Sequence, residues 1–266
     1  MSIKLFVSDI DGTLLSPGKN PSAKNIAAIK AMTDAGIIFT IATGRMYQAA
    51  LPIAQTLGVN VPIITYNGAL IKSTNGEIIH SEYLPQEVVY ELVNFFMERN
   101  IHLQTYSEDI LRYPAKNKFT ESYETMQKVS GEAVGWDGLK KNLSHVCKVL
   151  SICETAEENF KIIRAVEENF AGKVDVTKSA PIFAEIVSPS VSKASATKIL
   201  AKKFGIDKSE IAAIGDADND LPMLLSAGTS IAMGNATDEV KKSCTVTTSN
   251  CEDDGFAEAV YKYVLK

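Results

Sequence analysis

The segment Ile3-Lys4-Leu5-Phe6-Val7-Ser8-Asp9-Ile10-Asp11-Gly12-Thr13, residues 3–13, decides how the rest of the chain is interpreted. Its apolar run Ile3–Val7 is typical of a strand that is buried on both faces of a parallel sheet. Asp9 and Asp11 follow two residues apart, so on an extended chain their side chains point to the same side. Gly12 then permits a sharp turn. We therefore expect two carboxylates to lie together where a buried strand ends.

Four further apolar runs resemble the first and predict the other strands of the same sheet. These runs are Gly36–Ala42, Val61–Thr65, Ile211–Ile214 and Ser230–Met233. Between the first two strands, Ile26 and Ile29 recur at helical spacing and Gly36 provides a stop signal. Strand, helix and strand in this order form a right-handed crossover. The expected fold class is therefore α/β, with a doubly wound, Rossmann-like parallel sheet.

The chain between residues 84 and 186 has a different pattern, in which amphipathic helices alternate with short strands. Each half has the order helix, strand, strand, and Trp136-Asp137-Gly138 predicts a turn within this region. The expected elements are the helices Gln86–Arg99, Phe119–Val129 and Glu157–Phe170 and the strands Ile101–Tyr106, Ile110–Tyr113, Val146–Ile152, Lys173–Thr177 and Ile182–Val187. We predict an inserted α/β domain at residues 85–185 and a discontinuous core domain formed by residues 1–84 and 186–266.

A second group of carboxylates, Gly215-Asp216-Ala217-Asp218-Asn219-Asp220, directly follows the apolar run Ile211–Ile214. Because the carboxyl ends of parallel strands meet at one edge of a sheet, this group is expected beside Asp9 and Asp11. Neighbouring carboxylates resist ionising together unless a cation offsets their repulsion, and carboxylate oxygens suit Mg²⁺. Two structural interpretations stay open, which are an Asp-Gly turn and an acidic helix N-terminus.

Two segments indicate a site for a phosphate group. Thr43-Gly44-Arg45 ends the second strand with a hydroxyl, backbone N–H groups and a guanidinium, all of which bind oxyanions. Lys193 precedes a predicted helix, Ala194–Phe204, and could bring a compact positive charge to the same group. The alternatives are ordinary turn chemistry for Thr43-Gly44 and a solvated surface lysine.

Composition excludes several classes of protein. The 266 residues include 27 Lys and Arg and 32 Asp and Glu, a net charge of −5, so a strongly basic nucleic-acid-binding face is not expected. No apolar run approaches the roughly 20 residues of a membrane-spanning helix, and the N-terminal residues lack a secretion signal. The four cysteines form no CxxC pair. These features favour a reduced, cytoplasmic protein, and they leave monomer and homodimer equally open.

Four segments, taken in order, resemble the motifs of haloacid dehalogenase-like (HAD) phosphatases of the Cof type. These segments are Asp9–Thr13, Thr43–Arg45, Lys193 and Gly215–Asp220. The segments Tyr66–Ala69, Met233–Ala236 and Glu252–Gly255 resemble further stretches that recur in that subgroup. The resemblance covers nearly the whole chain and implies an α/β cap inserted between the second and third motifs. One departure is visible, because Ala194 follows Lys193 where the family usually has glycine.

The resemblance implies a Mg²⁺-dependent phosphomonoesterase that works through an aspartyl-phosphate intermediate. Asp9 would be the nucleophile and Asp11 the general acid and base. A side-chain oxygen of Asp9, the backbone carbonyl of Asp11 and the carboxylate of Asp216 would hold Mg²⁺. Thr43 and Lys193 would bind the phosphoryl oxygens. Five residues are expected around the phosphate and metal, which are Gly12, Thr13, Gly44, Asn219 and Asp220, and three are expected to line the substrate pocket, which are Arg45, Asn67 and Asn235.

The expected substrates are small cytosolic phosphate esters, with sugar phosphates first and phosphorylated cofactors such as pyridoxal phosphate or FMN next. Two other functions stay open. A phosphomutase or phosphotransferase would pass the phosphoryl group to a second hydroxyl without releasing free phosphate. A non-catalytic phosphate- or metal-binding module would bind its ligand without turnover. No nucleic-acid or membrane partner is expected.

Overall fold

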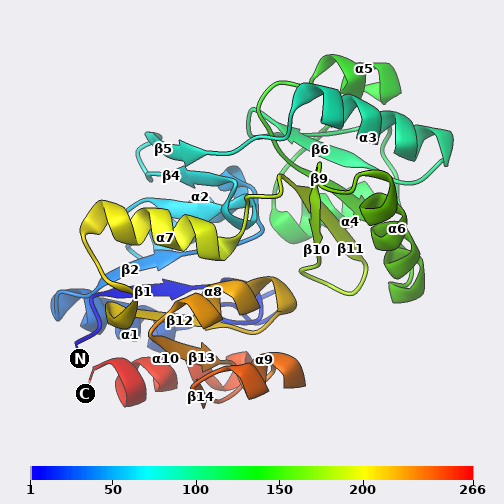
Figure 1. Cartoon of the computed structure of the whole chain (residues 1–266). Coiled ribbons are helices and arrows are strands. Elements are labelled where there is room, and N and C mark those ends of the chain that lie inside the picture. The colour runs from blue at the N-terminus through cyan, green and yellow to red at the C-terminus, as the bar shows by residue number, and fades with distance from the viewer. Residues whose placement is uncertain (1, 266) are drawn as a thin grey trace. The chain divides into compact units, whose positions relative to one another are not determined.

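The computed structural model of the protein describes residues 2–265 and divides into two compact units (Figure 1). Within the described chain, unit 1 comprises residues 2–44, 50–80 and 192–265. Unit 2 comprises residues 45–49 and 81–191. Unit 1 is therefore built from three separate stretches of sequence, and the long stretch of unit 2 lies between the second and the third.

A parallel sheet of five strands forms the centre of unit 1, in the order β14-β13-β12-β1-β2. The strands are β1 (Leu5–Ser8), β2 (Ile38–Ile41), β12 (Ile211–Gly215), β13 (Thr229–Ala232) and β14 (Val246–Thr247). The central strand β1 is wholly buried, as its unbroken apolar run predicts. Ser8 lies opposite Ile41 on one side and opposite Ile214 on the other. The predicted α/β fold with a parallel sheet is confirmed.

A smaller antiparallel sheet continues unit 1 beside β2. It consists of β3 (Ile63–Thr65), β4 (Leu70–Lys72) and β5 (Ile78–Ser81). A single parallel bridge between Ala42 and Ile64 joins it to the end of β2. The three-residue turn η1 (Tyr66–Gly68) connects β3 to β4. The end of β2 and this turn are therefore neighbours.

Helices follow the strands of unit 1 (Figure 1). They are α1 (Ala23–Asp34), α2 (Tyr47–Thr56), α7 (Lys193–Phe204), α8 (Leu221–Ser226), α9 (Asp238–Ser243) and α10 (Gly255–Ala259). α1 packs on α10 and β2. The ring of Phe256 in α10 makes edge-to-face contacts with the rings of Phe6 and Phe39, at centroid distances of 5.7 and 6.0 Å. α8 packs on β12 and β13 and against α7.

Unit 2 contains a six-stranded sheet in the order β10-β11-β9-β6-β7-β8. Its strands are β6 (Gln104–Ser107), β7 (Ile110–Tyr113), β8 (Glu132–Ala133), β9 (Val146–Ile152), β10 (Asp175–Thr177) and β11 (Phe183–Val187). Its helices are α3 (Gln86–Glu98), α4 (Lys118–Gln127), α5 (Gly135–Lys141) and α6 (Ala156–Asn169). β9 lies between two helix–strand–strand units, α3-β6-β7 and α6-β10-β11.

The central strand β9 contributes both to the apolar core of unit 2 and to a buried ion pair. Val149 lies in the hydrophobic core of unit 2 together with Phe96 of α3 and Ile186 of β11. The next residue toward the N-terminus, the buried Lys148, forms an ion pair of 2.8 Å with the buried Glu185.

Two local predictions differ from the structure. The predicted turn at Trp136 is the first part of helix α5, and the reason is visible at Gly138, where a Cβ would clash with the side chain of Val134. Gly138 is therefore required by close packing within a helix and does not mark a turn. In unit 1, the helix that was expected to start at Ala194 begins one residue earlier, at Lys193.

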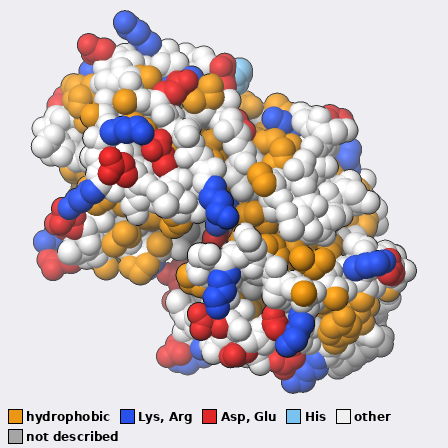
Figure 2. Space-filling model, turned by 180° about the vertical axis from the view of Figure 1, so that it is seen from behind, with side chains coloured by type: hydrophobic (Ala, Val, Ile, Leu, Met, Phe, Trp, Pro, Cys, Tyr) orange, Lys and Arg blue, Asp and Glu red, His pale blue; other side chains and the backbone are white. Residues whose placement is uncertain are grey.

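The outer surface carries charges of both signs. In Figure 2, Lys, Arg, Asp and Glu side chains are scattered over the visible face, with hydrophobic side chains between them. Within residues 2–265, no helix has the length and apolar character needed to cross a bilayer.

Candidate active site

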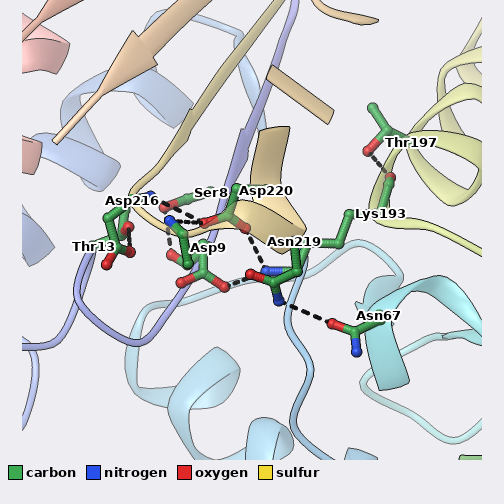
Figure 3. A network of polar contacts seen from close by, with 10 residues as sticks. Ser8, Asp9, Thr13, Asn67, Lys193, Thr197, Asp216, Asn219 and Asp220 are labelled. Carbon is green, nitrogen blue, oxygen red and sulfur yellow. Dashed lines mark hydrogen bonds and ion pairs between the residues drawn. The ribbon is translucent and has the colours of Figure 1, made fainter. Parts of the chain in front are cut away.

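Parallel pairing of β1 with β12 brings the two predicted carboxylate groups together (Figure 3). Asp9 follows β1, and its backbone N–H donates a hydrogen bond of 3.0 Å to the carbonyl of Ile214, the penultimate residue of β12. Asp216 comes directly after β12. One carboxylate oxygen each from Asp9, Asp216 and Asp220 lies within 4.8 Å of the other two. Residues more than 200 positions apart thus form one acidic cluster.

Gly12 allows the chain after β1 to pass close to Asp216. Its φ of +82° lies in the left-handed region, and a Cβ at this position would clash with the carboxylate of Asp216. The hydroxyl of Thr13 donates a hydrogen bond of 2.8 Å to Oδ1 of Asp216. The amide Nδ2 of Asn235 donates to the carbonyl of Gly12 at 2.8 Å and to Oδ2 of Asp216 at 3.4 Å. These contacts orient the Asp216 carboxylate.

Lys193 enters the cluster from the first turn of α7. Its Nζ lies 2.6 Å from Oδ1 of Asp9 and 2.5 Å from Oδ1 of Asp220, and its side chain is 1% exposed. Ser192 caps the helix, because its hydroxyl accepts a hydrogen bond from the backbone N–H of Ser195. Burial lowers the pKa of Lys193, but the carboxylates of Asp220 and Asp9 outweigh burial and hold that pKa above its usual range. The ammonium therefore stays charged.

Asp220 uses both of its oxygens inside the protein. Oδ2 accepts hydrogen bonds of 3.0 Å from the backbone N–H groups of Asp216 and Ala217, and Oδ1 contacts Lys193. This wholly buried carboxylate shapes the loop after β12 and holds the ammonium in place. Asp220 thus accepts three polar contacts among the described residues, compared with two at Asp216 and one at Asp9.

The cluster contains more buried negative charge than Lys193 can balance. Burial raises the pKa of Asp9 well above its ordinary value, and the neighbouring Asp220 raises it further. Burial also raises the pKa of Asp216, to about 7, with Asp220 adding to the effect. Three carboxylates beside one ammonium leave negative charge that a divalent cation could balance, and hard oxygen donors are the ligands that Mg²⁺ takes. The donor set thus fits the metal ion that the sequence predicts.

The end of β2 supplies the next part of the site. Thr43 is buried, and its backbone N–H donates a hydrogen bond of 3.0 Å to the carbonyl of Ile64. The backbone N–H of Asn67 donates to the carbonyl of Thr43 at 3.0 Å. The side chain of Asn67 accepts a hydrogen bond of 3.1 Å from Nδ2 of Asn219 (Figure 3). Three of the four predicted motifs therefore meet through β1, β2 and β12, and α7 brings the fourth.

The remaining predicted residues lie in different surroundings. Asp11 is exposed and forms a backbone bridge with Leu15. Arg45 is half-buried and belongs by its contacts to unit 2, one residue after Gly44. Asn235 is exposed, and besides Gly12 and Asp216 it bonds the backbone N–H of Cys251. The roles of these residues toward substrate and metal stay predictions.

Sequence reasoning missed three supporting hydroxyl groups. Ser8 donates a hydrogen bond of 2.7 Å to the carbonyl of Asp9, and Thr197 donates one of 2.7 Å to the carbonyl of Lys193. Ser192 caps α7. Only Ser192 left a signal, because serines at 192 and 195 are spaced as in a capping box. A lone Ser or Thr inside a strand or helix has no such signature.

Comparison with known proteins agrees with this geometry. Residues 6–260 match the family described as haloacid dehalogenase-like hydrolase. A Bacillus subtilis protein named 5-amino-6-(5-phospho-D-ribitylamino)uracil phosphatase YwtE is 30% identical, with 96% of each chain covered. The HMP-PP phosphatase of Serratia proteamaculans is 26% identical over 90% of this chain and 86% of its own.

Solved structures share the fold over nearly the whole chain. A haloacid dehalogenase-like hydrolase from Bacteroides thetaiotaomicron has a TM-score of 0.89 at 29% identity, with 98% of this chain and 99% of the other covered. The protein TM0651 of Thermotoga maritima has a TM-score of 0.84 at 30% identity, with 98% and 97% covered.

Proposed function

The chain belongs to the family of haloacid dehalogenase-like hydrolases, and from this premise we propose that it is a Mg²⁺-dependent phosphomonoesterase of small phosphorylated metabolites. The observation that supports this most directly is the cluster of Asp9, Asp216 and Lys193 at the end of the central strand. A buried carboxylate beside a buried ammonium is suited to accept a phosphoryl group whose oxygens are negatively charged.

Asp9, Asp216 and the backbone carbonyl of Asp11 would hold the metal ion. When bound, Mg²⁺ would neutralise charge on the carboxylates and on the phosphoryl oxygens. This assignment leaves Asp220 to Lys193 and to the backbone of the loop after β12, which agrees with its hydrogen bonds. Thr13 and Asn235 would keep the Asp216 carboxylate oriented.

Hydrolysis would proceed in two steps at Asp9. In the first, a carboxylate oxygen of Asp9 attacks phosphorus, an acyl-phosphate bond forms, and the bond between phosphorus and the ester oxygen breaks. Asp11 gives its proton to the departing oxygen. In the second, Asp11 takes a proton from water as that water attacks the acyl phosphate, which releases inorganic phosphate and restores Asp9.

The other polar groups would bind the charge that the phosphoryl group carries. The Lys193 ammonium and the hydroxyl and backbone of Thr43 are placed to donate to phosphoryl oxygens. Gly44 supplies a further N–H group, and Asn219 and Asp220 hold the surrounding loops. The carboxylate of Asp9 contacts the Lys193 ammonium, which would orient the nucleophile.

The proposed substrates are sugar phosphates first, then phosphorylated cofactors. The name of the Bacillus subtilis relative specifies a 5-phospho-D-ribityl group, which is a sugar-alcohol phosphate, and a second relative acts on a different phosphorylated compound, HMP-PP. Relatives with one chemistry and different leaving groups agree with a shared phosphoryl site. We propose that unit 2 is a cap domain that selects the leaving group, with Arg45, Asn67 and Asn235 lining the pocket, in a cytoplasmic protein.

A panel of phosphorylated metabolites tests the proposal. The purified protein is incubated with each compound and Mg²⁺, and released phosphate is measured; we expect turnover of at least one sugar phosphate and of a generic aryl phosphate. A chelator should stop hydrolysis, and added Mg²⁺ should restore it. Transfer to a second hydroxyl without free phosphate would indicate a phosphomutase. Tight Mg²⁺-dependent binding without turnover would indicate a non-catalytic module.

A further inference from the structure

We infer that the turn Tyr66–Gly68, called the 66–68 turn below, is a positioning element that sets Thr43, Lys193 and Asn219 relative to one another. The inference rests on the proposed function, because it concerns how the phosphoryl site is held together. It assigns to these residues a role that their sequence pattern does not reveal. Three observations carry it, one from the backbone, one from hydrogen bonds and one from packing.

The backbone of the 66–68 turn is left-handed at three consecutive residues. The φ values are +53° at Tyr66, +58° at Asn67 and +110° at Gly68. Asparagine and glycine adopt this region readily, but a bulky residue such as tyrosine does so only when its surroundings hold it there. All three residues are buried. The surrounding contacts therefore impose a conformation that the turn would not choose alone.

Hydrogen bonds connect this turn to two of the motifs. The backbone N–H of Asn67 donates to the carbonyl of Thr43 at 3.0 Å. The backbone N–H of Thr43 donates to the carbonyl of Ile64, in the strand β3 that leads into the turn. The side-chain oxygen of Asn67 accepts from Asn219 at 3.1 Å. One residue thus contacts the end of β2 through its backbone and the loop after β12 through its side chain (Figure 3).

Close packing connects the turn to α7. A Cβ at Gly68 would clash with the backbone carbonyl of Ser192 and would lie 3.2 Å from Cβ of Ala196. Ser192 is the N-cap of the helix, and its carbonyl accepts the first helical hydrogen bond, 3.1 Å from the N–H of Ala196. Lys193 is the next residue. The absence of a side chain at Gly68 therefore determines how close the start of this helix can come.

The consequence is that the turn fixes the ammonium of Lys193. Its Nζ contacts Asp9 and Asp220 at 2.6 and 2.5 Å, so a small shift of the helix start would separate these groups. Reacting groups that are misplaced by about 1 Å can lose about 100-fold in rate. A disturbed turn should therefore lower turnover without unfolding the protein.

The test compares Gly68→Ala with Gly76→Ala. Gly76 also has a left-handed φ, +97°, but a Cβ there would meet nothing within 4 Å, so this variant has a similar backbone strain without the packing conflict. For Gly68→Ala we expect kcat to fall about 100-fold on an aryl phosphate, with KM changed less than about threefold. Gly76→Ala should keep kcat within about twofold at a similar unfolding midpoint. Equal kcat values for two folded variants would overturn the inference.

If Gly68→Ala does not fold, substitutions at Asn67 test the positioning role of the 66–68 turn. Asn67→Ala removes both the left-handed preference and the bond to Asn219, whereas Asn67→Gly keeps the backbone freedom. We expect Asn67→Gly to recover a large part of the kcat that Asn67→Ala loses. In a cycle with Asn219→Ala, the two alanine substitutions should be non-additive. Wild-type kcat in Asn67→Ala would contradict the inference.

A binding measurement separates this inference from the proposed function. Affinity for inorganic phosphate, measured by calorimetry in Mg²⁺, should fall about tenfold in Gly68→Ala and stay unchanged in Gly76→Ala. If the wild-type protein hydrolyses no phosphate ester, the proposed function fails, and phosphate binding alone then decides the positioning role. Unchanged phosphate affinity in the Gly68 variant would be evidence against that role.

Discussion

Asp9 is buried among two carboxylates and an ammonium, and each neighbour constrains what can replace it. Asparagine has nearly the same shape but no charge, so Asp9→Asn should leave Lys193 paired with Asp220 and the fold intact. We expect kcat to fall by at least about 1,000-fold, because the amide cannot attack phosphorus. Phosphate release and circular dichroism are the measurements.

Asp238→Asn is the matched control for this change. Asp238 is exposed in the first turn of α9, and its loss should leave kcat within about twofold, as is usual for surface sites. Substantial turnover by purified Asp9→Asn would show that another group is the nucleophile.

His102 should make unit 2 sensitive to acid. Burial lowers the pKa of His102 from 6.5 to about 4, against an opposing hydrogen bond with Gln104. Between these two pH values the unfolded chain binds a proton that the native protein does not bind, so stability falls as the pH falls from 6.5 toward 4. The loss is up to about 3 kcal/mol. Urea unfolding at pH 7 and pH 4.5 measures it.

In His102→Gln, the part of the pH dependence that comes from this residue should disappear. His145→Gln is the control, since the side chain of His145 is 59% exposed. An identical pH dependence in wild type and His102→Gln would disprove the assignment.

At the scale of elements, α7 combines a structural cap with a proposed catalytic group at its first residue. Ser192→Ala removes the cap hydrogen bond to Ser195, which costs about 1 kcal/mol of stability. Because the next residue is Lys193, we also expect a clear loss of kcat. Ser22→Ala removes the equivalent cap of α1, which bears no site residue, and should cost similar stability with kcat retained. Equal kcat in the two variants would argue against this coupling.

The paired strands β9 and β11 allow a test of a buried ion pair. Lys148 and Glu185 are 1% and 3% exposed, so removing the Lys148 ammonium leaves the Glu185 carboxylate buried without this counter-charge. Lys148→Met should cost about 3 to 5 kcal/mol in urea unfolding, while the double variant with Glu185→Leu should recover much of that loss. Lys161→Met is the control, because its pair with Glu157 is exposed and should contribute less than about 1 kcal/mol.

Periodicity predicted long or strongly apolar elements well and very short ones poorly. The run Ile211–Ile214 and the helix Gln86–Arg99 correspond closely to β12 and α3. By contrast, β14 has only two residues, Val246 and Thr247, and no window detects a period in so short a strand. The turn at Trp136 was predicted wrongly, because glycine was interpreted as a turn residue where it serves packing.

At the scale of the whole molecule, the predicted metal site connects distant parts of the chain. Asp9 and Asp216 lie in the first and last segments of unit 1. A ligand that binds only when both are in place stabilises the folded state, by about 2.7 kcal/mol at 100 times its Kd. We expect Mg²⁺ to raise the unfolding temperature of the wild type and to raise that of Asp216→Asn much less. An equal shift in both proteins would exclude Asp216 as a ligand.

The proximity of the motif residues could be predicted because parallel strands end at one edge of a sheet. That rule predicts that Asp9, Thr43 and Asp216 lie close together. It could not predict that Asp220 would use both oxygens internally, or that Gly68 would pack against Ser192. Such contacts depend on loop conformation, which has no period in the sequence. The unusual backbone at Tyr66 has no compositional signal either.

The interrupted course of unit 1 also has a consequence for biosynthesis. Asp9 leaves the ribosome early, but Asp216 is translated 207 residues later, after all of unit 2. At typical rates of synthesis, this delay is roughly 10 to 40 s. During that time β1 has no β12 beside it, so a nascent chain carries its proposed nucleophile in an incomplete sheet, and the proposed hydrolysis has to wait until β12 and Asp216 have been made.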